Sequence, residues 1–223
     1  MGDSHCLSVD TWRILNQLHH GVRTPHTWVQ LDDALALLNR AIMELAAFSG
    51  MEMENMTRGN GWTFLDIGRR LERSVNLVSL VRAALTSTGA SDAVLEPLLE
   101  IADSSMTYRR WYYAQAQLAP VLDLLLADDG NPHSLAFQVK AMAGHIERLP
   151  HPPNAPVPTR EQAAIICLDA TLREADIKAS CDARRSGSSA PLDVLLDRFV
   201  MELQALSDTI AHYYFSHAGP QVS

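Results

Sequence analysis

The chain has 223 residues, a formal net charge of -8 and 47% hydrophobic residues. That length suits one large domain or two small ones, and the apolar content is sufficient for a packed core. The negative charge argues against an extended nucleic-acid-binding surface, which requires a clustered basic face. We therefore expect a globular protein that does not bind nucleic acid.

The three cysteines, Cys6, Cys167 and Cys181, do not have the spacing of a metal site. A low, odd number of cysteines is typical of free thiols in a reducing cytosol. The first residues lack the charged and apolar segments of a signal peptide, and no apolar run reaches the ~18 residues of a membrane span. The sequence predicts a cytoplasmic protein with no membrane partner.

In the first part of the chain, apolar residues recur at spacings of three and four, which predicts amphipathic helices. Ser8 and Thr27 are candidate N-caps of the first two. The stripe of the second helix, from Leu31 to Phe48, is expected to be buried, with Gly50 near its end. The expected elements are helices over 9–22, 28–50 and 62–85, with an irregular helix and turn over 51–61.

The later part of the chain also reads as helices. Two or three are expected over 92–128, with breaks near Ser104 and Pro120. Asn131 as N-cap and Pro132 in the first turn would begin the next helix. The remaining expected elements are an extended proline-rich connector over 150–158, a helix from a capping box at 159–162 to about residue 184, and a helix over 192–215. The fold class is therefore all-α, a multi-helix antiparallel bundle.

The stretch GNGWTFLDIGRRLERS, residues 59–74, combines a helical apolar pattern with five charged residues. Helical geometry places Glu72 roughly 120° from the centre of the apolar stripe, beside the small residues Gly68 and Ser79. One interpretation is an exposed ion-pair network worth a few tenths of a kcal/mol per pair. The other, which we favour, is a partly buried Glu72 that contacts an arginine at a helix–helix seam.

The most aromatic stretch, SSMTYRRWYYAQAQ at 104–117, has two interpretations. In the first, it forms a buried helix in which the Tyr hydroxyls and the Trp N–H form hydrogen bonds. In the second, it forms a surface where Arg109 and Arg110 bind an anion. The sequence contains no Glu-x-x-His pair and no glycine-rich phosphate-binding motif, so we expect no metal and no cofactor.

Four stretches, GWTFLDIGRRLERS, SSMTYRRWY, DDGNPHSLAFQ and HIERLP, together resemble the bacterial alpha-E domain family, which is all-helical and has a Glu-Arg motif. TWRILNQL at 11–18 resembles a segment from the middle of that family. The resemblance implies one alpha-E-like domain over 1–223 that lacks the family's earlier helix and Asn-Pro-x-Ser segment. The residues it singles out are Asp66, Arg69, Arg70, Glu72, Arg73, Tyr108, Arg109, Arg110, Asn131, Pro132 and Ser134.

The resemblance also implies a functional setting, because family members occur beside or fused to circularly permuted ATP-grasp ligases and transglutaminase-like peptidases. We expect an accessory helical module of a bacterial peptide or amide-bond modification system, with an ATP-grasp ligase or its peptide substrate as partner. The alternative is a catalytic domain in which Glu72, oriented by Arg69 or Arg73, is an acid or base while Arg109 and Arg110 hold an anionic substrate. An apolar face that the missing segment would cover predicts a homo-oligomer.

Overall fold

The computed structural model describes residues 9–23, 30–87, 92–112, 115–151, 153–154 and 156–216. These residues form helices, helical turns and connections without a strand, so the all-α prediction is confirmed. The chain divides into two compact units, Met1–Leu65 and Asp66–Ser223, which are described separately. The expectation of a single domain over 1–223 stays a prediction.

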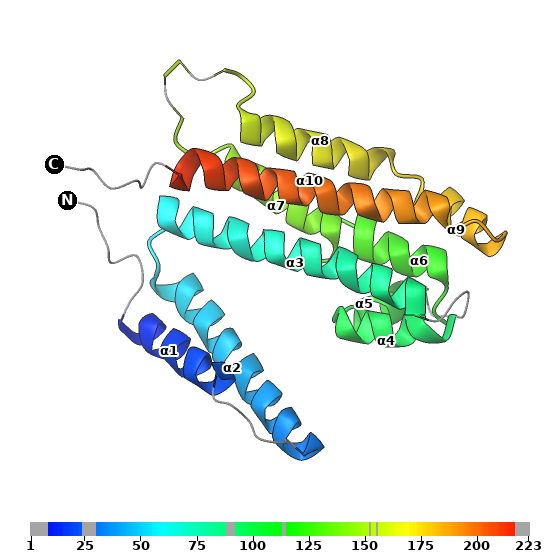
Figure 1. Cartoon of the computed structure of the whole chain (residues 1–223), viewed down its shortest axis with the longest axis horizontal. Helices are drawn as coiled ribbons and strands as arrows, with labels where there is room; N and C mark the ends of the chain where they lie inside the picture. Colours follow the sequence, from blue (N-terminus) through cyan, green and yellow to red (C-terminus); the bar gives the residue numbers. More distant parts are fainter. Residues whose placement is uncertain are drawn as a thin grey trace. The chain divides into compact units, whose positions relative to one another are not determined.

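The first unit contains a pair of helices, α1 (Val9–Arg23) and α2 (Leu31–Asn55), which contact each other (Figure 1). Helix α2 continues through Gly50 to Asn55, so the expected helix end at Gly50 is wrong, whereas the turn that we expected before the next helix is present at residues 56–59. One glycine costs a helix interior only about 1 kcal/mol, which a long helix tolerates. The expected caps Ser8 and Thr27 lie outside the described residues.

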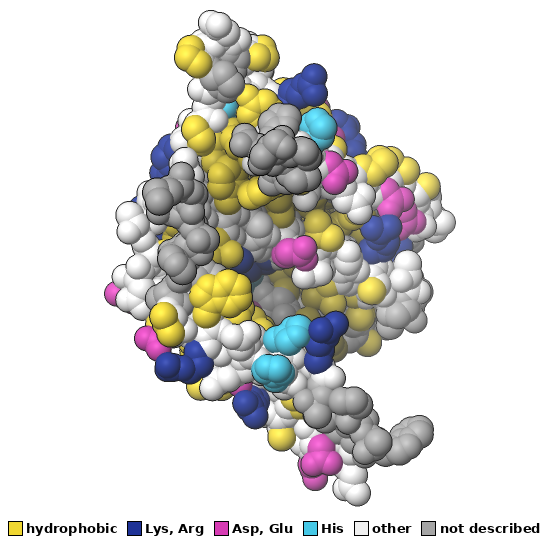
Figure 2. All heavy atoms as spheres, turned by 60° about the vertical axis from the view of Figure 1, so that its left-hand side comes forward, with side chains coloured by type: hydrophobic (Ala, Val, Ile, Leu, Met, Phe, Trp, Pro, Cys, Tyr) yellow, Lys and Arg dark blue, Asp and Glu magenta, His cyan; other side chains and the backbone are white. Residues whose placement is uncertain are grey.

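The apolar stripe of α2 is largely exposed, contrary to our prediction. Leu35, Leu38 and Ile42 are 49%, 58% and 62% exposed, because α1, with 15 residues, covers only part of a helix of 25. Hydrophobic side chains are also visible at the surface in Figure 2. An 18-residue window of α2 has a mean hydropathy of 1.3 and is 0% buried, so by length and composition alone this helix is apolar enough to cross a membrane.

The second unit is an antiparallel bundle whose long helices are α3, α7, α8 and α10 (Figure 1). Arg82 on α3 pairs with Asp197 near the start of α10, whereas Asp66 near the start of α3 contacts His145 near the end of α7. Helices α7 and α10 therefore run opposite to α3. The elements are α3 (Asn60–Ser87), η1 (Asp92–Val94), α4 (Leu95–Ile101), α5 (Ser105–Tyr112), α6 (Leu118–Leu122), the π-helical turn η2 (Asp123–Ala127), α7 (Leu135–Ile146), α8 (Arg160–Glu174), α9 (Ile177–Arg185) and α10 (Ala190–Phe215).

Three expected boundaries are wrong. Helix α7 begins at Leu135 with Ser134 as its N-cap, since Asn131 makes other contacts. Pro120 lies in the first turn of α6, where its missing N–H costs nothing, and does not end a helix. The helix after Thr159 stops at Glu174, and Asp176 caps a separate α9.

Two other expectations about connections agree with the structure. Thr159 and Gln162 form the predicted capping box at the start of α8. The described residues of the proline-rich connector, 150–151, 153–154 and 156–158, are not helical. Leucine and other apolar side chains of α3, α6, η2, α7, α8 and α10 form the core, with Val78, Leu125, Val139, Leu168 and Phe199 fully buried.

Candidate functional site

A buried polar chain joins α3 to α7, with Asp66 at its centre. The Asp66 carboxylate accepts a hydrogen bond from Arg70 Nε at 2.7 Å and lies 2.6 Å from Nε2 of His145. Arg69 lies further away, with Nη1 4.0 Å from the second carboxylate oxygen. The side chains of Asp66 and His145 are each only 8% exposed, so this contact is shielded from water.

The contacts of His145 determine its tautomer. Nη2 of Arg148 lies 2.6 Å from His145 Nδ1, and a guanidinium group can only donate, so Nδ1 must accept. The ring proton therefore resides on Nε2, which donates to Asp66. Both ring nitrogens of His145 are therefore engaged by side chains of the bundle.

The polar chain continues from α3 to the loop before α7. Nη1 of Arg70 donates to Gln138 Oε1 at 3.0 Å, and Gln138 Nε2 donates to the carbonyl of Pro132 at 2.5 Å. Gln138 is 1% exposed, and both of its hydrogen bonds are partly buried. The arginine of one motif thereby fixes the backbone of another that lies about sixty residues later in the sequence.

The charges around Asp66 shift two pKa values. Burial alone would raise the pKa of Asp66, but the hydrogen bond and charge of Arg70 and the contact with His145 outweigh it, so this pKa is lowered. Burial and the neighbouring Arg69 and Arg70 lower the pKa of Arg73. Positive charge therefore exceeds negative charge along this part of α3.

Glu72 does not belong to the buried chain, and our expectation of a partly buried Glu72 is wrong. Glu72 is exposed, and no heavy atom outside the local helix would contact a Cβ placed at Gly68, so no second helix packs there. The buried face of α3 includes Asp66, Ser74 and Leu77 as well as the predicted apolar stripe. The buried face is therefore wide enough to include Asp66, whereas Glu72 lies about 120° from Asp66 around the helix and faces water.

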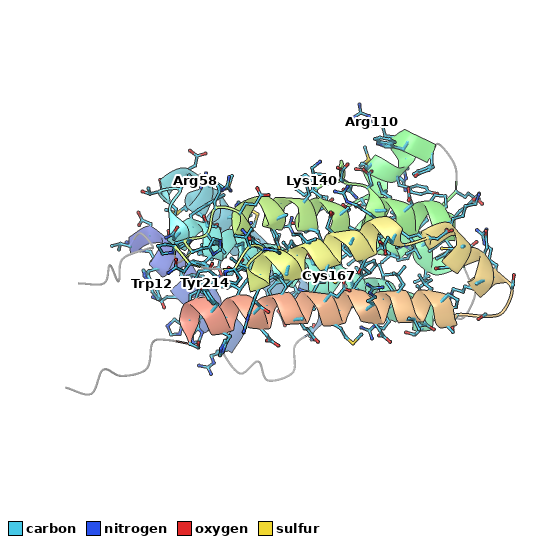
Figure 3. The ribbon with its side chains drawn as sticks, turned by 90° about the horizontal axis from the view of Figure 1, so that it is seen from above. Trp12, Arg58, Arg110, Lys140, Cys167 and Tyr214 are labelled. Carbon is cyan, nitrogen blue, oxygen red and sulfur yellow. The ribbon has the colours of Figure 1, made fainter. Side chains whose placement is uncertain are left out.

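Helix α5 is held by Tyr108, which is 1% exposed. Its hydroxyl donates to the carbonyl of Gln115 and accepts from the backbone N–H of Gln117, and its ring stacks on Tyr112 with centroids 4.8 Å apart. This anchor directs Arg109 and Arg110 of the same helix to solvent, as Figure 3 shows for Arg110. Tyr113 lies outside the described residues.

The Asp128–Ser134 loop is held by buried side chains. Asn131 Nδ2 donates to Ser104 Oγ and to the Leu124 carbonyl, each at 3.1 Å, while its Oδ1 accepts from the backbone N–H of His133. Ser134 caps α7 by accepting from Phe137 N–H and donates to the Asp128 carbonyl. The loop is thus fixed against the start of α5, so two motifs that resemble the family meet in space.

An open groove of about 1150 Å³ lies between α5 and this loop. Arg109, Arg110 and Trp111 line one side, and Gly130 and Pro132 line the other. Arg109 is 3.6 Å from Glu96 in an exposed pair, whereas no described carboxylate lies within 4.0 Å of Arg110. Trp111 is 65% exposed, so the groove offers a cation and an aromatic face together.

A second hollow of about 440 Å³ is lined by Arg73 from α3 and by Asp103 and His133, among others. Glu72 lines neither this hollow nor the groove. The catalytic alternative required Glu72 to share one pocket with Arg109 and Arg110, and the structure does not bring them together. Within the described ranges, no three His, Cys, Asp or Glu side chains gather as a metal site.

Sequence reasoning missed three members of the buried chain, Gln138, His145 and Arg148. A signal for two of them was present in HIERL, where His145 and Arg148 are three apart and share a helical face. Their link to Asp66 depends on how α3 packs against α7, which the spacing within either helix does not contain.

The fold and site define an all-helical bundle with a hydrogen-bonded polar chain between α3 and α7 and an open groove that contains exposed arginines. Residues 5–215 match the Alpha-E family, described as a predicted alpha-helical domain with a conserved ER motif. This chain therefore belongs to the Alpha-E family, as its motifs indicated.

The curated relatives are uncharacterised mycobacterial proteins. Those of Mycobacterium tuberculosis (strain H37Rv) and Mycobacterium bovis (strain AF2122/97) are each 28% identical to this chain over 212 residues. The alignments cover 92% of this chain but only 24% of each relative. The chain thus spans about a quarter of the length of these relatives. No solved structure matches it.

Proposed function

We propose that this chain is a non-catalytic accessory module of a bacterial peptide or amide-bond modification system. It works in the cytoplasm with an ATP-grasp-type ligase and binds that ligase or its peptide substrate. The observation that carries this proposal is the open groove in which Arg110 and Trp111 are exposed beside a loop fixed by buried hydrogen bonds.

The chemistry of the groove supports binding. Arginine and tryptophan are enriched at the energetic centres of protein interfaces, because both combine a large contact area with directional polar groups. The Asn131 and Tyr108 contacts hold the two walls in place, so little ordering entropy is lost when a partner binds. A fixed groove with an available guanidinium suits a carboxylate-bearing ligand.

A non-catalytic role is supported by the state of the polar groups. Asp66 is neutralised by Arg70, and both ring nitrogens of His145 are engaged. The groove that contains Arg109 and Arg110 is also lined by the hydroxyl-bearing Thr107, but no histidine or carboxylate among its lining residues would serve as a general base. The greater length of the mycobacterial relatives agrees with a module that works alongside other domains.

Co-expression of the chain with an ATP-grasp ligase from the same organism tests this proposal. We expect the two to co-purify, or the ligase to show altered kinetics, and Arg110→Glu with Trp111→Ala to abolish the effect. Arg160→Glu is the matched control, since Arg160 is exposed and lines neither hollow. A ligase that neither co-purifies nor changes its kinetics with the wild-type chain would refute the proposal.

A further inference from the structure

The groove and the second hollow are neighbours on the same loop. Pro132 lines the groove, and the next residue, His133, lines the hollow. The backbone N–H of His133 donates to Asn131 Oδ1 at 3.1 Å, and Gln138 holds the Pro132 carbonyl. Residues 130–133, which we call the ridge because they separate the two depressions, are therefore held in a fixed position on the bundle.

Each depression contains one arginine without a close acidic partner. In the part of the chain that the structure describes, no carboxylate lies within 4.0 Å of Arg73 or Arg110, although Asp66 influences Arg73 at longer range. Asp103 also lines the second hollow, with its carboxylate 3.4 Å from Nε2 of His133. Two cationic positions thus flank the ridge on a chain whose formal net charge is -8.

Apolar side chains stand beside both arginines. Met106 and Trp111 line the groove and are 80% and 65% exposed, while Leu80 and Ile101 line the hollow. A chain that alternates carboxylates with apolar groups would satisfy both kinds of surface. A nucleic acid would instead bring a continuous row of phosphates to a protein with an excess of negative charge.

We propose that the groove and the hollow are two subsites for one extended acidic peptide, which crosses the 130–133 ridge with one carboxylate at Arg110 and another at Arg73. This inference rests on the proposed function, for which it specifies the ligand. The guanidinium groups select carboxylates by paired hydrogen bonds, and the apolar walls contact the intervening side chains.

The test uses a fluorescein-labelled ten-residue peptide of alternating Glu and Leu, with its Lys–Leu counterpart as a charge control. In fluorescence anisotropy, Arg73→Glu and Arg110→Glu should each weaken binding about five- to tenfold, because a reversed charge replaces attraction by repulsion. Arg160→Glu should bind as the wild type does. Calorimetry should give one peptide per chain, and affinity should fall with added salt.

Several outcomes would overturn the inference: no binding to the wild type, unchanged affinity in Arg73→Glu, two peptides per chain, equal binding of the Lys–Leu peptide, or tighter binding of a single-stranded oligonucleotide. If only Arg110→Glu weakens peptide binding, the groove is a single binding site and the two-subsite inference is wrong, but the proposed function is not contradicted. Failure of the proposed function appears separately, as the absence of any effect on the ligase. Circular dichroism of each variant verifies that it is folded.

Discussion

The buried chain at Asp66 and the open groove at Arg110 both contain arginines but differ in exposure. Around Asp66, the side chains of Arg70, Gln138 and His145 each have a partner on another turn or helix. In the groove, Arg110 faces solvent and Trp111 is mostly exposed. Removing the partner of a buried polar group lowers the free energy of unfolding strongly, whereas an exposed polar group contributes little to stability and is available to a ligand. The first region therefore holds the fold, and the second is available for binding.

The largest expected effect comes from Asp66→Ala. Removing the carboxylate takes the acceptor away from the buried His145 and from Arg70, whose side chain is only 23% exposed, so unfolding free energy should fall by about 3–5 kcal/mol. Urea unfolding followed by circular dichroism measures the loss. Glu72→Gln is the control and should change stability by less than about 0.5 kcal/mol, because Glu72 is exposed. If both variants lose the same free energy of unfolding, the claim that Asp66 holds the fold and Glu72 does not is wrong.

A smaller loss is expected for Asn131→Ala. This residue is 1% exposed, and its side chain connects Ser104, the Leu124 carbonyl and the His133 N–H. Unfolding free energy should fall by about 1–3 kcal/mol, the cost of leaving buried polar groups unsatisfied. The ridge beside the groove should also loosen, so binding of the acidic peptide should weaken. Normal peptide binding by a destabilised variant would show that the loop does not need this residue to shape the groove.

The pH dependence of stability gives a third, still smaller effect. The pKa of Asp66 is lowered from its ordinary value of 3.8, so the charged form stabilises the fold above that pH. This contribution should be lost as pH falls below 3.8 through the lowered pKa of the folded state. The difference in unfolding free energy between wild type and Asp66→Asn should therefore be full near neutral pH and shrink in acid. A difference that stays constant through this range would contradict the ionised pairing with Arg70.

The smallest effect on stability is expected in the groove. Arg110→Glu changes an exposed side chain with no close acidic partner, so unfolding free energy should change by no more than about 0.5 kcal/mol. Peptide binding should nevertheless weaken several-fold. A thermal unfolding scan beside the anisotropy titration separates the two readouts. A strongly destabilised Arg110→Glu would place this arginine with the structural charges instead.

The second Glu-Arg pair, Glu147–Arg148, clarifies what these dipeptides do here. Both Glu72 and Glu147 are exposed, whereas Arg148 reaches back to a buried histidine. Glu147 is the C-cap of α7 and Arg148 lies in the turn that follows, so this pair marks the end of a helix, whereas Glu72 and Arg73 lie within α3. The Glu-Arg dipeptides therefore lie in or beside helices of the bundle, but neither glutamate is the acid that is buried.

Local patterns in the sequence determined the helical class, the capping box at Thr159 and Gln162, and the apolar faces of α3 and α10, because period and cap chemistry act within a few residues. The sequence also singled out Asp66, Arg70, Asn131 and the arginines of α5 through their motifs. Only the tertiary structure decided which charges were buried, because a rotation of α3 by a fraction of a turn exchanges Asp66 for Glu72. The joining of the motifs through Gln138 and the opening of a groove beside Pro132 likewise depend on contacts between segments far apart in the chain, which no spacing within a helix encodes.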